Sequence, residues 1–222
     1  MLRIFTLIFA LALPGAALAC QPLPLGSQFD VELPRDGSHN PALFNLAVLH
    51  AVNTARCNAG LPLLAVEPGL NNAAQKHSDD MVRLGFFDHA SPVPGRETLV
   101  ARVQAEGLQP NRVAENIGQD YMVQYEQGRD YRVLSAAECR FTYERGVGLT
   151  DRAQGLVGRT PAEIPRQTYA SAGRSLVEGW LASSEHRSNL LDPAFSRHGA
   201  GFAVTEEETL CGRLIATQVL LQ

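Results

Sequence analysis

The sequence predicts an α+β domain in which several helices pack against a small antiparallel sheet that closes late in the chain. Apolar residues recur at helical spacing in separate stretches between residues 41 and 182, and two strand-like stretches follow at the C-terminal end. A layered arrangement buries the apolar face of each element. No repeat of fixed period is found.

Four helices are predicted from this spacing and from the signals at their ends. Asn40 is a good N-cap, and Pro41 follows at the first helical position. Glycine follows three of the stretches, which is typical of a helix C-terminus. The predicted helices are residues 41–59, 68–84, 97–106 and 172–182.

Three strands complete the prediction, separated by one long irregular stretch. Residues 113–117 fit a buried strand that carries Glu115 inward, and residues 198–205 and 213–221 form the closing pair. Residues 119–168 lack a sustained pattern. A loop of that length in a compact domain is usually functional or mobile, so we predict an insertion there.

The N-terminal residues predict export. Residues 1–19 contain one Arg, an apolar run and the site Ala17-Leu18-Ala19, as a secretory signal peptide does. Cleavage would leave residues 20–39 as an extended leader and residues 40–222 as the domain. No later stretch is long and apolar enough to span a membrane. We therefore expect a periplasmic or secreted protein without a transmembrane segment in the mature chain.

The cysteine count gives an alternative to a free exported chain. Cys20 would be the first mature residue and could carry a lipid anchor, but Ala17 stands where a lipoprotein signal has Leu. Four cysteines instead form two disulfides with no free thiol, in any of three connectivities. The four are Cys20, Cys57, Cys139 and Cys211.

The charge distribution argues against a nucleic-acid partner. The net charge is −4, and the predicted signal peptide contains a positive residue, so the mature chain is more acidic still. The basic residues are almost all Arg and are scattered along the chain. They form no polybasic signal for a membrane surface.

Three separate segments of the sequence contain the candidate site residues. His89 lies in residues 87–92, Glu115 in residues 114–118 and His186 in residues 183–191. Imidazole nitrogen and carboxylate oxygen are the usual ligands of zinc-like ions. The sequence therefore predicts a polar or metal-binding cleft.

A set of motifs in fixed order resembles the CAP superfamily of cysteine-rich secretory, antigen 5 and pathogenesis-related 1 proteins, in its bacterial secreted form. The resemblance implies an α-β-α sandwich whose cleft is lined by two His and two acidic residues and holds a divalent ion in some members. His89 and His186 match the histidines and Glu115 the first carboxylate, whereas Ser183 stands in place of the second. The motifs are Asn53-Thr54-Ala55-Arg56, Gly60-Leu61-Pro62-Leu63, His77-Ser78, His89-Ala90-Ser91-Pro92, Ala114-Glu115-Asn116-Ile117-Gly118, Gly179-Trp180, His186-Arg187, Asn189-Leu190-Leu191, Gly199-Ala200-Gly201 and Ala216-Thr217-Gln218.

Three functions stay open, and we favour the first. It is a non-enzymatic module that binds a small ligand, a lipid or an envelope protein through the cleft and residues 119–168. The second is a metal-assisted extracellular hydrolase of peptides or esters, with a divalent ion such as Zn held by His89, Glu115 and His186. The third is a passive envelope protein with a vestigial cleft.

No catalytic residue is assigned, because neither G-x-S-x-G nor H-E-x-x-H occurs. The tyrosines of the insertion raise the further hypothesis of a lid or specificity element beside the cleft. Whether they face the cleft or the solvent tests that hypothesis. They are Tyr121, Tyr125, Tyr131 and Tyr143.

Overall fold

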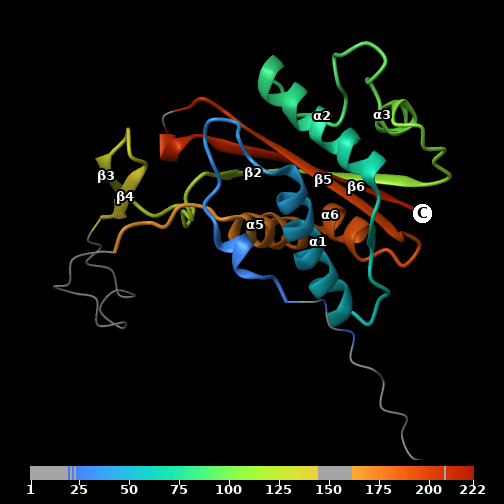
Figure 1. Cartoon of the computed structure of the whole chain (residues 1–222), viewed down its shortest axis with the longest axis horizontal. Coiled ribbons are helices and arrows are strands. Elements are labelled where there is room, and N and C mark those ends of the chain that lie inside the picture. Colours follow the sequence, from blue (N-terminus) through green and yellow to red (C-terminus); the bar gives the residue numbers. More distant parts are fainter. Residues whose placement is uncertain (1–19, 21, 23, 145–161, 208) are drawn as a thin grey trace, which may run out of the picture.

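A computed structural model of the chain describes residues 20, 22, 24–144, 162–207 and 209–222. The predicted signal peptide and residues 145–161 of the predicted insertion lie outside these described residues. A four-stranded sheet forms the middle layer of an α-β-α sandwich (Figure 1). Helices α2 (Pro68–Leu84) and α3 (Leu99–Ala105) lie on one side of it, and α1 (Pro41–Asn58), α5 (Tyr169–Ala182) and α6 (Ser184–Leu190) on the other. The predicted α+β class is confirmed.

The strand order in this sheet is β1-β5-β6-β2. Strands β5 (Arg197–Val204), β6 (Arg213–Leu221) and β2 (Val113–Tyr121) pair antiparallel, as predicted. The unpredicted β1 (Ala65–Val66) is only two residues long and pairs with β5 in parallel, so the sheet is mixed. Strand β2, which carries Glu115, is an edge strand.

The ends of the helices follow the sequence signals. The Asn40 side chain accepts hydrogen bonds from the N–H groups of Ala42 and Leu43, and α2 ends at Gly85 in the left-handed conformation. Helix α5 begins at Tyr169, three residues before the predicted start, because Thr168 and Ser171 form a capping box. Two further glycines, Gly199 and Gly201 on β5, let α2 lie directly on the sheet, since a Cβ at either would overlap the α2 backbone.

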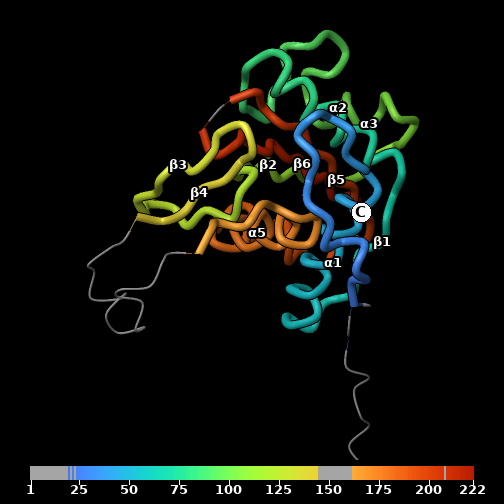
Figure 2. Tube along the Cα trace, turned by 60° about the vertical axis from the view of Figure 1, so that its left-hand side comes forward, coloured from blue at the N-terminus to red at the C-terminus, as the bar shows by residue number. Residues whose placement is uncertain are grey.

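Beyond β2, the described part of the insertion is packed against the domain. It contains an unpredicted hairpin, β3 (Tyr131–Ser135) and β4 (Arg140–Tyr143), beside the N-terminal end of α5 (Figure 2). Four of its buried side chains belong to the main hydrophobic core: Met122, Val123, Phe141 and Ile164. The insertion therefore adds to the core, at the end of the sheet where β2 finishes.

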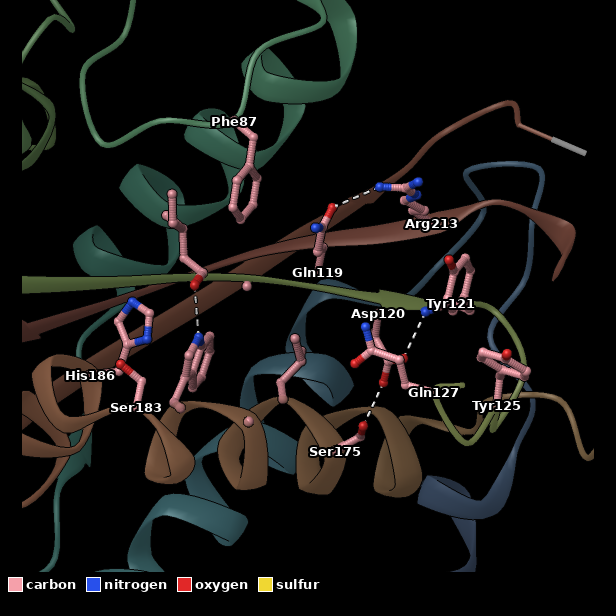
Figure 3. A pocket seen from close by; sticks show the side chains of 15 residues that line it. Phe87, Gln119, Asp120, Tyr121, Tyr125, Gln127, Ser175, Ser183, His186 and Arg213 are labelled. Atoms are coloured by element: carbon pink, nitrogen blue, oxygen red, sulfur yellow. Dashed lines mark hydrogen bonds between the residues drawn. The ribbon is translucent and has the colours of Figure 1, made fainter. Parts of the chain in front are cut away.

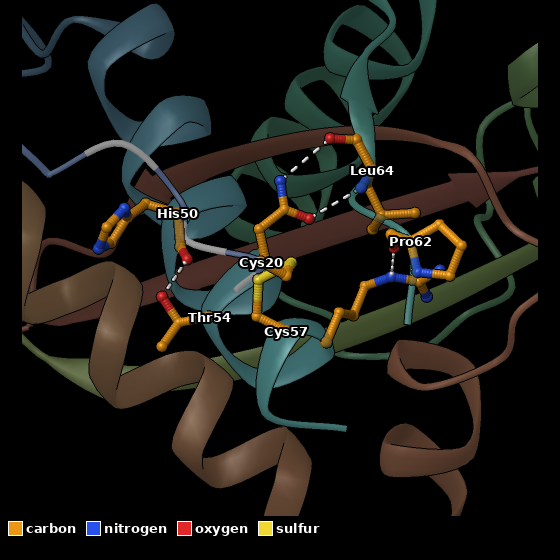
Figure 4. Close-up of a disulfide and its surroundings, with 8 residues drawn as sticks. Cys20, His50, Thr54, Cys57, Pro62 and Leu64 are labelled. Carbon is orange, nitrogen blue, oxygen red and sulfur yellow. Dashed lines mark hydrogen bonds between the residues drawn. A yellow bond between two sulfur atoms is a disulfide. The ribbon is translucent and has the colours of Figure 1, made fainter. Parts of the chain in front are cut away.

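The four cysteines form two disulfides, as expected, and no described cysteine is free. Cys139 joins the hairpin to Cys211, two residues before β6, and Cys20 joins the leader to Cys57 on α1 (Figure 4). The leader is also packed, because Phe29 and Leu33 are buried. No described helix is long and apolar enough to cross a membrane.

Candidate functional site

The carboxylate of Glu115 is buried on β2 and paired with an arginine. Both of its oxygens accept hydrogen bonds from Arg102 Nη2, at 2.9 and 2.7 Å, and the two side chains are 2% and 1% exposed. A buried carboxylate is costly unless its charge is matched, and Arg102 supplies the match. The sequence analysis missed Arg102, because an arginine on an amphipathic helix ordinarily faces solvent.

His89 completes the shell around Glu115. Its Nδ1 lies 2.9 Å from Glu115 Oε1, and its backbone carbonyl accepts from Arg102 Nη2 at 3.0 Å. The hydrogen bond to Glu115 raises the pKa of His89 above its ordinary value. About half of the His89 side chain is exposed, so it forms the accessible end of the cluster.

A third imidazole, that of His77 on α2, is fully buried behind this pair. Its Nε2 lies 3.9 Å from Glu115 Oε1 but only 3.0 Å from the carbonyl oxygen of Asp88. Burial lowers the pKa of His77. His77 thus supports the loop before His89 as a neutral side chain and is not accessible to a ligand.

His186, the second predicted histidine, lies at the start of α6. Burial lowers its pKa, and the positive charge of His89 lowers it further. In the described chain no hydrogen bond joins His186 to His89 or Glu115. The structure thus brings His89 and Glu115 into contact and His186 only near them.

These three residues do not fit a divalent ion as they are arranged here. The Glu115 oxygens already accept from Arg102 and His89, and the guanidinium would repel a cation at the same carboxylate. Among the described residues, no group of three or more His, Cys, Asp or Glu side chains has a metal-binding arrangement. Zinc binding by His89, Glu115 and His186 stays a prediction.

A pocket of about 570 Å³ opens beside His186 (Figure 3). The end of β2 forms its floor, α5 forms one side, and Phe87 overhangs the other. It runs from His186 to the tyrosines of the insertion. The residues that line it are Phe87, Ile117, Gly118, Gln119, Asp120, Tyr121, Tyr125, Gln127, Ser175, Leu176, Gly179, Trp180, Ser183, His186 and Arg213.

Two of the four insertion tyrosines line this pocket, namely Tyr121 and Tyr125. Tyr131 and Tyr143 pack behind them, with ring centroids 5.6 and 6.2 Å from that of Tyr125. Such offset and edge contacts stabilise aromatic clusters. The insertion therefore supplies a fixed wall of the pocket.

The acidic side chain in the pocket, Asp120, is satisfied within the protein. Its Oδ2 accepts from Ser175 Oγ at 2.5 Å and Gln167 Nε2 at 3.2 Å, and its Oδ1 accepts from the Tyr121 N–H at 2.7 Å. Burial raises the pKa of Asp120. This carboxylate fixes the end of β2 to α5 and is not directed at a ligand.

No curated protein sequence matches this chain significantly. Solved structures to which the chain is similar include an extracellular SCP-domain protein of Bacillus anthracis (22% identity, TM-score 0.48, 81% of this chain and 40% of that one). Others are an outer surface protein of Borrelia burgdorferi (12%, 0.45, 77% and 86%) and a cysteine-rich secretory protein of Staphylococcus aureus (15%, 0.42, 84% and 41%).

The chain spans only about 40% of the length of the Bacillus and Staphylococcus proteins, and likeness at this level carries no argument about function. The model of the cysteine-rich secretory protein family (CAP) matches residues 49–219. This stretch contains every described helix and strand from β1 to β5 in chain order, together with most of α1 and of β6. That match covers most of the chain. The protein therefore belongs to the CAP family of cysteine-rich secretory proteins.

Proposed function

We propose that this chain is an exported CAP-domain binding protein whose ligand occupies the pocket between His186 and Tyr125. The observation that carries the proposal is the pocket itself. Its volume of about 570 Å³ lies within the range of about 300–1,000 Å³ that is common for ligand sites. It is also built jointly by the family core and by the insertion.

The lining favours recognition through apolar contact and hydrogen bonds. Phe87 and Tyr125 offer ring surfaces, while Ser183 and Gln119 offer uncharged polar groups. The charged side chains of Asp120 and Arg213 already have partners. Asp120 accepts hydrogen bonds from Ser175 and Gln167. Arg213 Nε lies 3.2 Å from Glu207 Oε2, and Arg213 Nη1 donates to Gln119 Oε1. A predominantly uncharged ligand is therefore expected.

Trp180 provides the readout for a test. It is the only Trp, it lies in the pocket wall, and its Nε1 donates to the Ile117 carbonyl at 2.9 Å. We would titrate the purified mature protein with three probe sets, namely hexapeptide mixtures, short cell-wall glycans and short-chain phospholipids. Tryptophan fluorescence and the midpoint of thermal unfolding, Tm, would be recorded.

One probe class is expected to shift the Trp180 emission and raise Tm. Tyr125→Ala and His186→Ala, at the two ends of the pocket, should weaken that response. Val133→Ala is the matched control, because Val133 is an exposed apolar residue of the hairpin outside the pocket. No response to any class, or equal responses in all variants, would refute the proposal.

A further inference from the structure

The floor of the pocket is the open edge of a β-sheet. In an antiparallel pair, successive residues direct their N–H and C=O groups to opposite sides of the strand. The Met122 N–H donates to the Gly212 carbonyl, and β2 pairs Asp120 with Leu214 and Gly118 with Ala216. The main-chain N–H and C=O groups of the even-numbered residues of β2 therefore bond to β6. Those of the odd-numbered residues point away from β6, to the open side of the strand.

Side chains cover the first part of this open edge. The Glu115 carbonyl accepts from Asn189 Nδ2 at 3.4 Å, and the Ile117 carbonyl accepts from Trp180 Nε1 at 2.9 Å. The Tyr121 N–H is taken by Asp120 Oδ1. Between them, neither the N–H nor the C=O of Gln119 has a partner among the described residues, and Gln119 is exposed. Gln119 thus presents an unpaired donor and an unpaired acceptor inside the pocket.

Unpaired strand edges are templates on which another strand can form, so proteins usually cover them. Here the cover provided by Asn189 and Trp180 ends at the Ile117 carbonyl, two residues before Gln119. Phe87 overhangs this edge on one side and α5 lies along the other, as Figure 3 shows. The opening is therefore shaped as a slot over the edge of β2.

Gly179 on α5 supplies a second, independent observation. A glycine inside a helix is less stable than an alanine, so it needs a packing or functional reason. Gly173 has a packing reason, because a Cβ there would overlap the Ala47 backbone. A Cβ at Gly179 would meet no atom within 4 Å, yet Gly179 lines the pocket. Its effect is to leave space beside Leu176 and Trp180.

We propose that the open edge of β2 at residues 117–121 binds an extended peptide segment, which adds to the sheet as a further strand. The peptide backbone would donate to the Gln119 carbonyl and accept from the Gln119 N–H, as in other cases of strand addition. This assignment rests on the proposed function and names its ligand class.

The flanks define which side chains such a peptide would carry. Successive side chains of a strand point to opposite faces. One would therefore enter the space over Gly179, against Leu176 and Trp180, and its neighbour would lie against Phe87. Both surroundings are apolar and the pocket charges are already paired. The expected ligand is an extended segment with two consecutive apolar, uncharged residues.

The test uses an array of random hexapeptides as the probe. A peptide selected by the wild-type protein would be resynthesised with a single N-methyl group at each amide in turn, which removes one donor. Methylation of the amide that pairs with the Gln119 carbonyl should weaken binding at least tenfold. Methylation of the next amide, which points away from β2, should change binding less than threefold. Equal loss at every amide, or no loss at any, would overturn strand addition.

Two variants at one position provide the matched control. Gly179→Leu should fill the space over the helix and weaken peptide binding at least tenfold, whereas Gly179→Ala, which adds only a methyl group, should bind with a smaller loss. Wild-type affinity in Gly179→Leu would overturn the placement of the peptide. The methylated peptides need no protein variant, so they decide the question even if Gly179→Leu fails to fold.

The outcomes separate this inference from the proposed function. A glycan or phospholipid that binds in the pocket while no peptide does would refute strand addition and leave the proposed function standing. Failure of all three probe classes would refute both.

Discussion

Two positions on β2, four residues apart, differ in whether their polar groups have hydrogen-bond partners. At Glu115 both carboxylate oxygens have partners, the main-chain carbonyl accepts from Asn189, and the side chain is buried. At Gln119 the main-chain groups have no partner among the described residues, and the residue is exposed. The recognisable cluster of charges at Glu115 is therefore largely self-contained. The unpaired main-chain groups lie farther along the same strand, at Gln119.

The largest expected effect concerns the self-contained cluster. Arg102→Met would remove the buried counter-charge of Glu115 and leave the half-exposed His89 as its remaining hydrogen-bond partner, which should lower the free energy of unfolding by about 3–5 kcal/mol. Denaturation in urea would measure this loss. Arg83→Met is the matched control, because its partner Asp80 keeps a second arginine, Arg96, and Arg83 is 58% exposed. A loss below about 1 kcal/mol for Arg102→Met would show that the pair is not essential.

The second effect concerns the wall that the insertion provides. Replacing Cys139 and Cys211 together by Ser opens a loop with a sequence separation of 72 residues, and should lower the free energy of unfolding by about 2–5 kcal/mol. The Tyr121 and Tyr125 wall should loosen, with a measurable loss of binding in the pocket. The equivalent change at Cys20 and Cys57, neither of which lines the pocket, is the control. Equal binding losses from both pairs would separate the insertion from the pocket.

The third effect concerns His198, a buried histidine on β5. His198 is fully buried, its Nδ1 accepts from Gln218 Nε2 at 3.1 Å, and burial lowers its pKa to about 4. The unfolded chain, with a His pKa near 6.5, binds the proton more tightly, so stability falls as the pH drops from 6.5 towards 4. The loss from this group is about 3 kcal/mol between pH 7 and pH 4. His198→Gln should remove that part of the pH dependence, and an unchanged profile would contradict the assignment.

The smallest effect concerns Gly179, the glycine of α5 that lines the pocket. Gly179→Ala should raise the free energy of unfolding by about 0.5–1 kcal/mol, because alanine is favoured over glycine inside a helix and its Cβ meets no atom. Gly173→Ala should destabilise instead, because its Cβ overlaps the Ala47 backbone. Thermal unfolding of the two variants measures both signs. Destabilisation by Gly179→Ala would mean that the glycine serves the fold and not the ligand.

The sequence predicted the helices and the late sheet because their signals are local. Asn40, Pro41 and Gly85 fix helix ends through their own backbone and side-chain chemistry. Strand β1 was missed, since two residues are too few to show a period, and α6 was missed because only Ser183 separates it from α5. The β3–β4 hairpin was missed because it lies in the stretch that lacks a sustained pattern.

The site was only half predictable. The approach of His89 to Glu115 was expected from the family resemblance, but the burial of Arg102 depends on how α3 packs against β2. The open edge at Gln119 depends on strand order, which places β2 beside β6 and leaves its other side without a strand. No pattern within residues 113–121 reports that order. Long-range arrangement, and not residue type, creates the candidate binding edge.

Amide hydrogen exchange along β2, measured residue by residue by NMR, decides whether the strand edge at Gln119 is open. We expect slow exchange at Gly118 and Asp120, whose N–H groups face β6, and fast exchange at Gln119, whose N–H is unpaired. A bound peptide should then slow the exchange of the Gln119 amide selectively. Strong protection of the Gln119 amide in the free protein, or no change on peptide binding, would show that this edge is not the binding site.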